Sequence, residues 1–174
     1  MEQHADFTEM KVYRLVLDPN TNSPIVVLQD EASGALLPIW IGIFEAHSIA
    51  MKMEGVEPNR PMTHDLLRNF FDVTKSLVDR IEVVDLVDNT YFARIYFYLN
   101  QQTYAIDSRP SDAIALALRT TSPIFVANHV LEKSKIEKSQ LQEFGEGESV
   151  ENEEDRWKAI LKSYNPDISK SKVN

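Results

Sequence analysis

The sequence predicts an α+β fold, in which a duplicated three-strand-plus-helix unit forms a mixed, largely antiparallel sheet with flanking helices. Three observations support this prediction. Two pairs of strand-like segments are each joined by a short polar turn. A third strand and an apolar helix follow each pair. The second strand-and-helix segment also resembles the first, and internal similarity of this kind changes the topology that a sequence predicts.

The paired strands are indicated by β-branched and aromatic residues that lie between turn-forming residues. In the first half, Met10–Asp18 and Pro24–Asp30 flank a turn rich in Pro and Asn. In the second half, Arg80–Asp88 and Tyr91–Leu99 flank an Asp-Asn-Thr turn. Both halves therefore begin with a predicted hairpin, and residues 123–126 add a short strand near the end of the domain.

The internal similarity is clearest where the third strand leads into a helix. Ile39–Met53 aligns without gaps with Tyr104–Leu118, at a constant offset of 65 positions. Within this alignment Ile49–Met51 matches Ile114–Leu116, so the apolar positions of the two helices coincide. We interpret the match as a duplication, and the alternative is chance similarity between two apolar helices.

Two helices in the middle of the chain are predicted from apolar residues at helical spacing. The first covers Ile43–Glu54 and carries Phe44, which we expect in the core together with Trp40. The second begins at Thr63, the predicted N-cap. Its predicted apolar side consists of Leu66, Leu67, Phe70 and Val73.

A third helix follows Pro110, which suits the first helical turn because proline lacks the N–H that this position leaves unpaired. Only small or apolar residues occur from Ala113 to Leu118. A helix that is apolar all round is buried. We therefore expect this helix either within the core or at a contact between subunits.

Length and composition predict one domain, residues 9–131, followed by a tail, residues 132–174. The tail is predicted to hold a charged helix, an acidic linker and a short C-terminal amphipathic helix around Trp157. The net charge is −9, and Glu143–Asp155 contributes −7 of it, which leaves −2 for the rest. No basic surface is evident. This disfavours tight, non-specific binding of nucleic acid, but transient binding at a local patch remains open.

Several kinds of chemistry and location are excluded by what the chain lacks. It has no cysteine, so no disulfide, thiolate nucleophile or cysteine-based zinc site is expected. No apolar run approaches the length that spans a bilayer, and the N-terminus lacks the pattern of a secretion signal. These features predict a cytoplasmic protein without a membrane partner.

The candidate site is the junction where the strand that ends with Tyr104–Ile106 meets the helix after Pro110. We expect this strand to be buried, and a short run of polar side chains follows it where a helix N-terminus has free N–H groups. Acidic residues and a histidine near two other helix starts complete the group. The candidate residues are Glu45, His64, Asp65, Asp107, Arg109 and Asp112, with Arg60 as an auxiliary.

Carboxylates and an imidazole that converge on a pocket could hold Mg²⁺ or Mn²⁺, which prefer oxygen ligands. The expected metal ligands are Glu45, Asp107 and Asp112. The expected catalytic residues are His64, as general acid or base, with Asp65 and Arg109. The expected phosphate ligands are Arg60 and Arg109, because a guanidinium can make two parallel hydrogen bonds.

These residues also have a purely structural interpretation. Glu45 and Asp112 fall in first helical turns, where acidic side chains interact favourably with the helix dipole. Asp107, if it ends a buried strand, needs a partner, and Arg109 or Arg60 could form a structural ion pair with it. The spacing of the acidic residues matches no strong metal motif.

Three stretches together resemble the bifunctional nuclease family, the BFN domain: Leu37–Ala50, Arg60–Leu67 and Asp107–Arg119. The resemblance extends over roughly 10–131, and residues 157–161 are similar to the short tail of many members. It implies a compact α+β domain that forms dimers or larger homo-oligomers in bacteria and has relatives in plants. It also implies nuclease activity on DNA and RNA, which is ascribed to some members. The six candidate residues lie within the matching motifs, and they are the positions at which the resemblance implies functional residues.

We therefore expect a metal-dependent nuclease in which Asp107→Ala abolishes cleavage while the fold survives. The alternative is a non-enzymatic oligomeric module that binds a protein or regulates one. The apolar third helix and the negative net charge favour that alternative. A small anionic ligand could also bind at the helix N-terminus formed by Ser108–Asp112.

Overall fold

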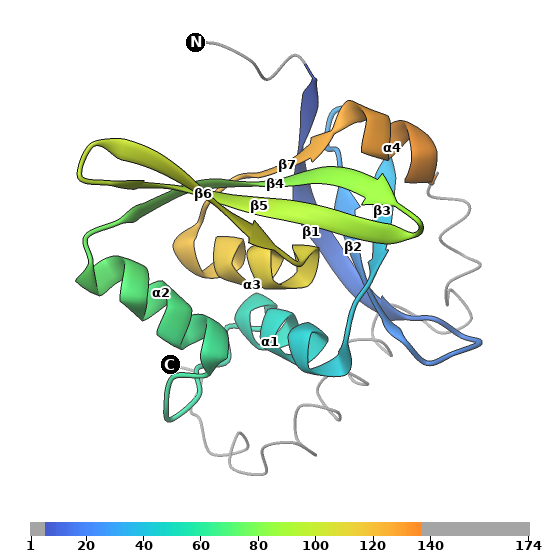
Figure 1. Cartoon of the computed structure of the whole chain (residues 1–174). Helices are drawn as coiled ribbons and strands as arrows, with labels where there is room; N and C mark the ends of the chain where they lie inside the picture. Colours follow the sequence, from blue (N-terminus) through green and yellow to red (C-terminus); the bar gives the residue numbers. More distant parts are fainter. Residues whose placement is uncertain (1–5, 137–174) are drawn as a thin grey trace.

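The computed structural model describes residues 6–136. They form a seven-stranded sheet with the strand order β3-β2-β1-β7-β4-β5-β6 and helices packed against it (Figure 1). The strands are β1 (Phe7–Leu17), β2 (Pro24–Gln29), β3 (Leu36–Trp40), β4 (Leu77–Val87), β5 (Thr90–Leu99), β6 (Gln102–Ser108) and β7 (Ile124–Ala127). The helices are α1 (Ile43–Met53), α2 (Thr63–Val73), α3 (Pro110–Thr120) and α4 (Asn128–Ser134).

The predicted duplicated unit and the predicted hairpins are confirmed. Strands β1-β2-β3 form one antiparallel meander that leads into α1, and β4-β5-β6 form a second that leads into α3. Strand β7 lies between the two meanders, antiparallel to β1 and parallel to β4. In the β4–β5 turn, Asp88 and Asn89 have φ values of 49° and 59°. Asp and Asn tolerate this left-handed conformation, which a two-residue hairpin turn requires.

Helix α3 is the centre of the core. It packs against α1, α2, β4 and β5, and Ala113–Ala117 are buried. Small alanine side chains alternate with the fully buried Ile114 and Leu116, which lets the neighbouring helices and strands approach α3 closely. The apolar third helix is thus a core helix. None of the helices within residues 6–136 is long and apolar enough to cross a membrane.

The three helices α1, α2 and α3 lie together on one face of the sheet, whereas α4 lies apart from them (Figure 1). The expected boundary at residue 131 falls within α4, where Val130 and Leu131 are buried. Beyond this helix, Ile136 pairs with Leu36 of the edge strand β3. The predicted acidic linker and C-terminal amphipathic helix lie outside the described residues.

Some side chains expected in the core are exposed. Phe44, in the first turn of α1, is 73% exposed. Trp40 ends β3 at the surface, where its indole N–H donates to Asp18. The predicted burial of Tyr104 and Ile106 is also wrong, since β6 is an edge strand that pairs only with β5.

Helix α2 differs from its prediction in its start and in its buried side. Its N-cap is Met62, not Thr63, and the amide N–H of Met62 donates to the carboxylate of Asp65 at 2.9 Å. The helix packs inward through Leu67 and the buried Phe71, so most of the predicted apolar side faces outward. The outward side chains, 60–82% exposed, are Leu66, Phe70 and Val73.

One buried side chain joins the three clustered helices. Arg119 of α3 is 5% exposed, and its Nε donates to Asp65 Oδ1 of α2 at 2.6 Å. Its Nη2 donates to the carbonyl oxygen of Ser48 in α1 at 3.2 Å. Burial raises the pKa of Asp65, but hydrogen bonds from Arg119 and from the Met62 amide outweigh it and hold the pKa below its ordinary value.

Removal of the Arg119 side chain should strongly destabilise the domain. Arg119→Ala leaves the partly buried carboxylate of Asp65 without its partner, and we expect the free energy of unfolding to fall by about 3 kcal/mol. Urea denaturation measures this change. Arg68→Ala is the matched control, because the Arg68–Asp72 pair on α2 is exposed and should contribute less than ~1 kcal/mol. Equal losses for the two variants would contradict the assigned role of Arg119.

The stability of the domain should also depend on pH through Asp65. Because folding lowers the pKa of this carboxyl, its contribution is complete above the unfolded-state value of 3.8 and is lost as pH falls through the lower folded-state value. The free energy of unfolding of the wild type should therefore decrease steeply below about pH 4. Asp65→Asn should weaken that dependence in acid denaturation curves. An unchanged slope would show that other carboxyls dominate.

Candidate functional site

A groove of about 510 Å³ lies between α2 and the strands β5 and β6. One end of it is polar and is formed where α2 and α3 begin. The rest is apolar. The polar lining consists of Thr63, His64, Ser108, Arg109 and Asp112, with Asp107 at a border shared with a hollow on the opposite face of the sheet, and the apolar lining consists of Leu67, Phe71, Ile95 and Ile106. The predicted strand-to-helix junction is therefore one wall of an open groove.

His64 is held between two other helices at the polar end. Its Nδ1 lies 2.8 Å from Ser48 Oγ of α1, and its Nε2 lies 3.1 Å from Asp112 Oδ1 of α3. A carboxylate can only accept a hydrogen bond, so Nε2 carries a hydrogen atom and donates the hydrogen bond to Asp112. Ser48 is 3% exposed and cannot serve as a nucleophile for a bulky substrate. Its role is to orient the imidazole.

Arg109 is the exposed cation of the site. It immediately precedes Pro110, which occupies the first turn of α3 as predicted. Its Nε donates to Asp112 Oδ2 at 2.8 Å, and its Nη2 donates to Asp112 Oδ1 at 3.1 Å and to Glu45 Oε1 at 2.8 Å. The Arg109 side chain is still 66% exposed. It can therefore contact a ligand from solvent while one edge of the guanidinium stays on the carboxylates.

The charges of Arg109 and Asp112 reinforce one another. The hydrogen bond and the charge of Asp112 raise the pKa of Arg109, with a smaller contribution from Glu45. Burial raises the pKa of Asp112, but the hydrogen bonds from Arg109 and His64 outweigh burial and lower it. Asp112 thus remains a carboxylate and Arg109 a cation at neutral pH.

Glu45 reaches the site because Gly42 has no side chain. Gly42 precedes α1, and a Cβ atom at this position would lie 2.2 Å from Glu45 Oε2. The carboxylate of Glu45 fills that space at the start of α1 and meets Arg109 from the start of α3. The acidic residues in the first turns of the two duplicated helices therefore face the same guanidinium.

Asp107 does not join this cluster. Its Cα pairs with that of Arg94 on β5, and paired residues of antiparallel strands direct their side chains to the same face. Arg94 lies on the face away from α2 and α3, since the next residue, Ile95, lines the groove. Asp107 is exposed, and Arg109 pairs with Asp112 and Glu45, so the expected structural pair with Arg109 is not formed.

The remaining predicted residues, Asp65 and Arg60, do not take part in the cluster. Asp65 faces Arg119 and joins the helices together. Arg60 is exposed in the loop before α2, outside the lining of the groove. Within residues 6–136, no three His, Asp or Glu side chains form a ready-made metal site. The structure brings together Glu45, His64, Arg109 and Asp112.

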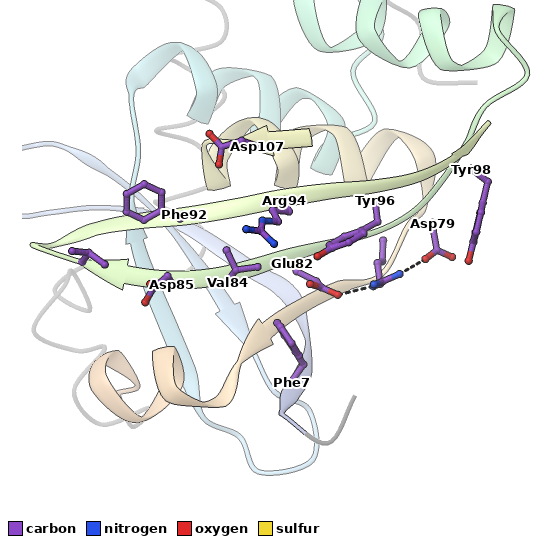
Figure 2. A pocket seen from close by; sticks show the side chains of 12 residues that line it. Phe7, Asp79, Glu82, Val84, Asp85, Phe92, Arg94, Tyr96, Tyr98 and Asp107 are labelled. Atoms are coloured by element: carbon purple, nitrogen blue, oxygen red, sulfur yellow. Dashed lines mark hydrogen bonds and ion pairs between the residues drawn. The ribbon is translucent and has the colours of Figure 1, made fainter. Parts of the chain in front are cut away.

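A larger hollow of about 950 Å³ lies on the opposite face of the sheet (Figure 2). Arg80 lies there over the ring of Tyr96, 4.1 Å from its centre, and makes ion pairs with two neighbouring carboxylates. The acidic side chains of its lining are Asp79, Glu82, Asp85 and Asp107, against two arginines. This net negative lining disfavours a phosphate ligand, so the smaller groove beside His64 is the better candidate site.

Sequence reasoning missed Ser48 and Arg119, although helical spacing contains a signal for each. Ser48 follows Glu45 by three positions, which places both on one side of α1. Arg119 follows Asp112 by seven positions, two turns along the same side of α3. A search for polar residues at helical spacing from a candidate residue, on an otherwise apolar helix, would have identified both Ser48 and Arg119.

Comparison with known proteins agrees with the motifs. The model of the bifunctional nuclease domain matches residues 26–139. An uncharacterized protein of Mycobacterium tuberculosis is 34% identical over 94% of this chain and 98% of its own length. Bifunctional nuclease 2 of Arabidopsis thaliana is 29% identical over 63% of this chain, and bifunctional nuclease 1 of rice (subsp. japonica) is 23% identical over 65%. The matched regions cover 34% and 35% of these plant proteins. The chain belongs to the bifunctional nuclease domain family.

Proposed function

We propose that this protein is a nuclease that hydrolyses phosphodiester bonds of nucleic acid at the polar end of the groove. The observation that carries the proposal is the exposed guanidinium of Arg109, fixed beside the His64–Asp112 pair. A cation that binds phosphate and a histidine that carries a proton are the two groups that this reaction needs at one place. The names of the plant relatives point in the same direction.

In this proposal Arg109 binds the non-bridging oxygens of the scissile phosphate. His64 acts as the general acid: Asp112 accepts the hydrogen bond from Nε2, and Ser48 Oγ, 2.8 Å from Nδ1, fixes the ring. As water attacks phosphorus and the bond to the leaving oxygen breaks, the Nε2 proton passes to that oxygen. The attacking water releases its proton to solvent, and His64 is reprotonated for the next cycle.

Two carboxylates of this site, those of Glu45 and Asp112, converge on the same nitrogen of Arg109. Glu45 Oε1 and Asp112 Oδ1 both bind Nη2 of Arg109, so positive charge is already accommodated between them. Mg²⁺ is commonly held by one or two carboxylates together with water and substrate phosphate. We therefore propose Glu45 and Asp112, without Asp107, as the residues that would hold Mg²⁺ or Mn²⁺. When bound, such an ion would offset the negative charge of the phosphate.

Cleavage of labelled single-stranded and duplex nucleic acid, with Mg²⁺, with Mn²⁺ and with chelator, tests this proposal. His64→Gln should lower the rate about 100-fold or more because it removes the proton carrier. Arg109→Ala should also impair cleavage, mainly through weaker substrate binding. Asp107→Asn is the matched control and should cleave like the wild type, since its side chain faces the other side of the sheet.

Three results would contradict the nuclease proposal or the location of its site. Equal rates for wild type and His64→Gln, prepared identically, would indicate a contaminating nuclease. Loss of cleavage in folded Asp107→Asn would move the site to the opposite face of the sheet. No cleavage by the wild type under any of the metal conditions would favour the non-enzymatic alternative.

A second candidate role is assembly into a homo-oligomer, and we infer it from the outer side of α2. Leu66, Phe70 and Val73 lie at successive turns of the helix and are each at least 60% exposed. A second copy of the chain is the occupant that fits, because a two-fold axis would pair this apolar stripe with itself. Contiguous apolar side chains of this kind mark interaction surfaces.

Sedimentation equilibrium tests the assembly role. The wild type should have a mass at least twice that of the 19.9 kDa chain. Phe70→Asp should shift the mass towards the single chain, since burial of an unpaired charge opposes association. Val87→Asp, at an exposed apolar position away from α2, is the control and should leave the mass unchanged. A monomeric wild type would contradict the inference.

A further inference from the structure

We propose that the apolar part of the groove binds an unstacked nucleobase, so that the site selects single-stranded nucleic acid. This inference rests on the proposed nuclease function, because it assumes that the phosphate lies at Arg109. The apolar lining begins directly beside the polar end, with Ile106 only three residues before Arg109. A site with a cation at one end and an apolar cleft next to it matches the two chemical parts of a nucleotide.

The cleft has the size and shape for a base. Leu67 and Phe71 of α2 form one wall, and Ile95 and Ile106 of β5 and β6 form the other. The whole groove, polar end included, has a volume of about 510 Å³, which is within the range of small-molecule sites. Ile106 faces the helix layer and yet is 44% exposed, because α2 does not close over the edge strand. An open apolar cleft at this position leaves room for a flat ligand.

An aromatic stack continues from the cleft along β6. Tyr104 lies two residues before Ile106 and therefore on the same face of the strand. Its ring stacks on Phe97, with centres 5.4 Å apart, and Phe97 packs edge-on against Phe71 at 5.2 Å. The Tyr104 ring is thus held in place while part of it remains exposed. A second base can stack there, as bases do on aromatic side chains of single-strand binding proteins.

Single strands are favoured for a geometric and an electrostatic reason. In a duplex the bases are paired and stacked inside, so only an unpaired base can enter the cleft while its phosphate contacts Arg109. The chain also has a net charge of −9 and offers few phosphate contacts. Its affinity must therefore come largely from the bases, and binding should depend only weakly on salt.

Fluorescence anisotropy in the presence of chelator tests base binding without cleavage. Three probes of equal length are compared: a single strand, its duplex, and an abasic strand with the same phosphodiester backbone. The single strand should bind about tenfold more tightly than either of the others. Ile106→Ser and Tyr104→Ala should each weaken binding of the single strand by about fivefold and leave the abasic strand unaffected. Leu77→Ser, exposed and outside the groove, is the control.

The possible outcomes separate the two proposals. Base recognition would be overturned if the abasic strand or the duplex bound as tightly as the single strand, or if no probe bound. It would also be overturned if Leu77→Ser weakened binding of the single strand as much as the groove variants do. Thermal denaturation of both groove variants checks that they are folded, and unchanged binding by the two would also overturn the inference. Base-dependent binding without metal-dependent cleavage would sink the nuclease proposal alone. Cleavage with base-independent binding would leave the nuclease proposal standing and remove this inference.

Discussion

The buried guanidinium of Arg119 is the interaction on which the site depends. It binds Asp65 in α2 and the carbonyl oxygen of Ser48 in α1 from its own position in α3. Asp65 neighbours His64 in the chain, and Ser48 holds the His64 ring. The Arg119 side chain therefore fixes the backbone at Ser48 and the backbone beside His64, the two residues that form this contact. A cluster assembled from three helices needs such a link, because no single helix contains more than two of its residues.

The duplicated architecture explains where the cluster lies. The equivalent helices α1 and α3 pack together, and the start of each carries one of the carboxylates that face Arg109. Glu45 and Asp112 each lie in the first turn of a helix, where an acidic side chain interacts favourably with the helix dipole. Helix α2, inserted between the two repeats, breaks the symmetry and adds His64 and one wall of the groove. The groove that α2 lines therefore lies beside the second half of the sheet.

Periodicity and turn residues were sufficient to predict the hairpins, the three helices and the duplicated unit, because these follow from local spacing. They also identified Glu45, His64, Arg109 and Asp112 at helix starts. The position of Asp107 could not be predicted in the same way, since the face on which a strand residue lies depends on its pairing register. Phe44 and Ile106 were misplaced because apolar character alone does not reveal which edges the helices leave uncovered. The exposed side chain of Ile106 became evidence about binding.

The claim that ligands bind beside the helices, and not in the larger hollow across the sheet, can be tested by NMR of arginine side chains. A short single-stranded oligonucleotide is titrated into the labelled protein with chelator present, and the Nε–H signals are followed. The account predicts a shift for Arg109 and no shift for Arg80 or Arg94, which line the opposite face. Shifts of Arg80 and Arg94 with an unchanged Arg109 would contradict it.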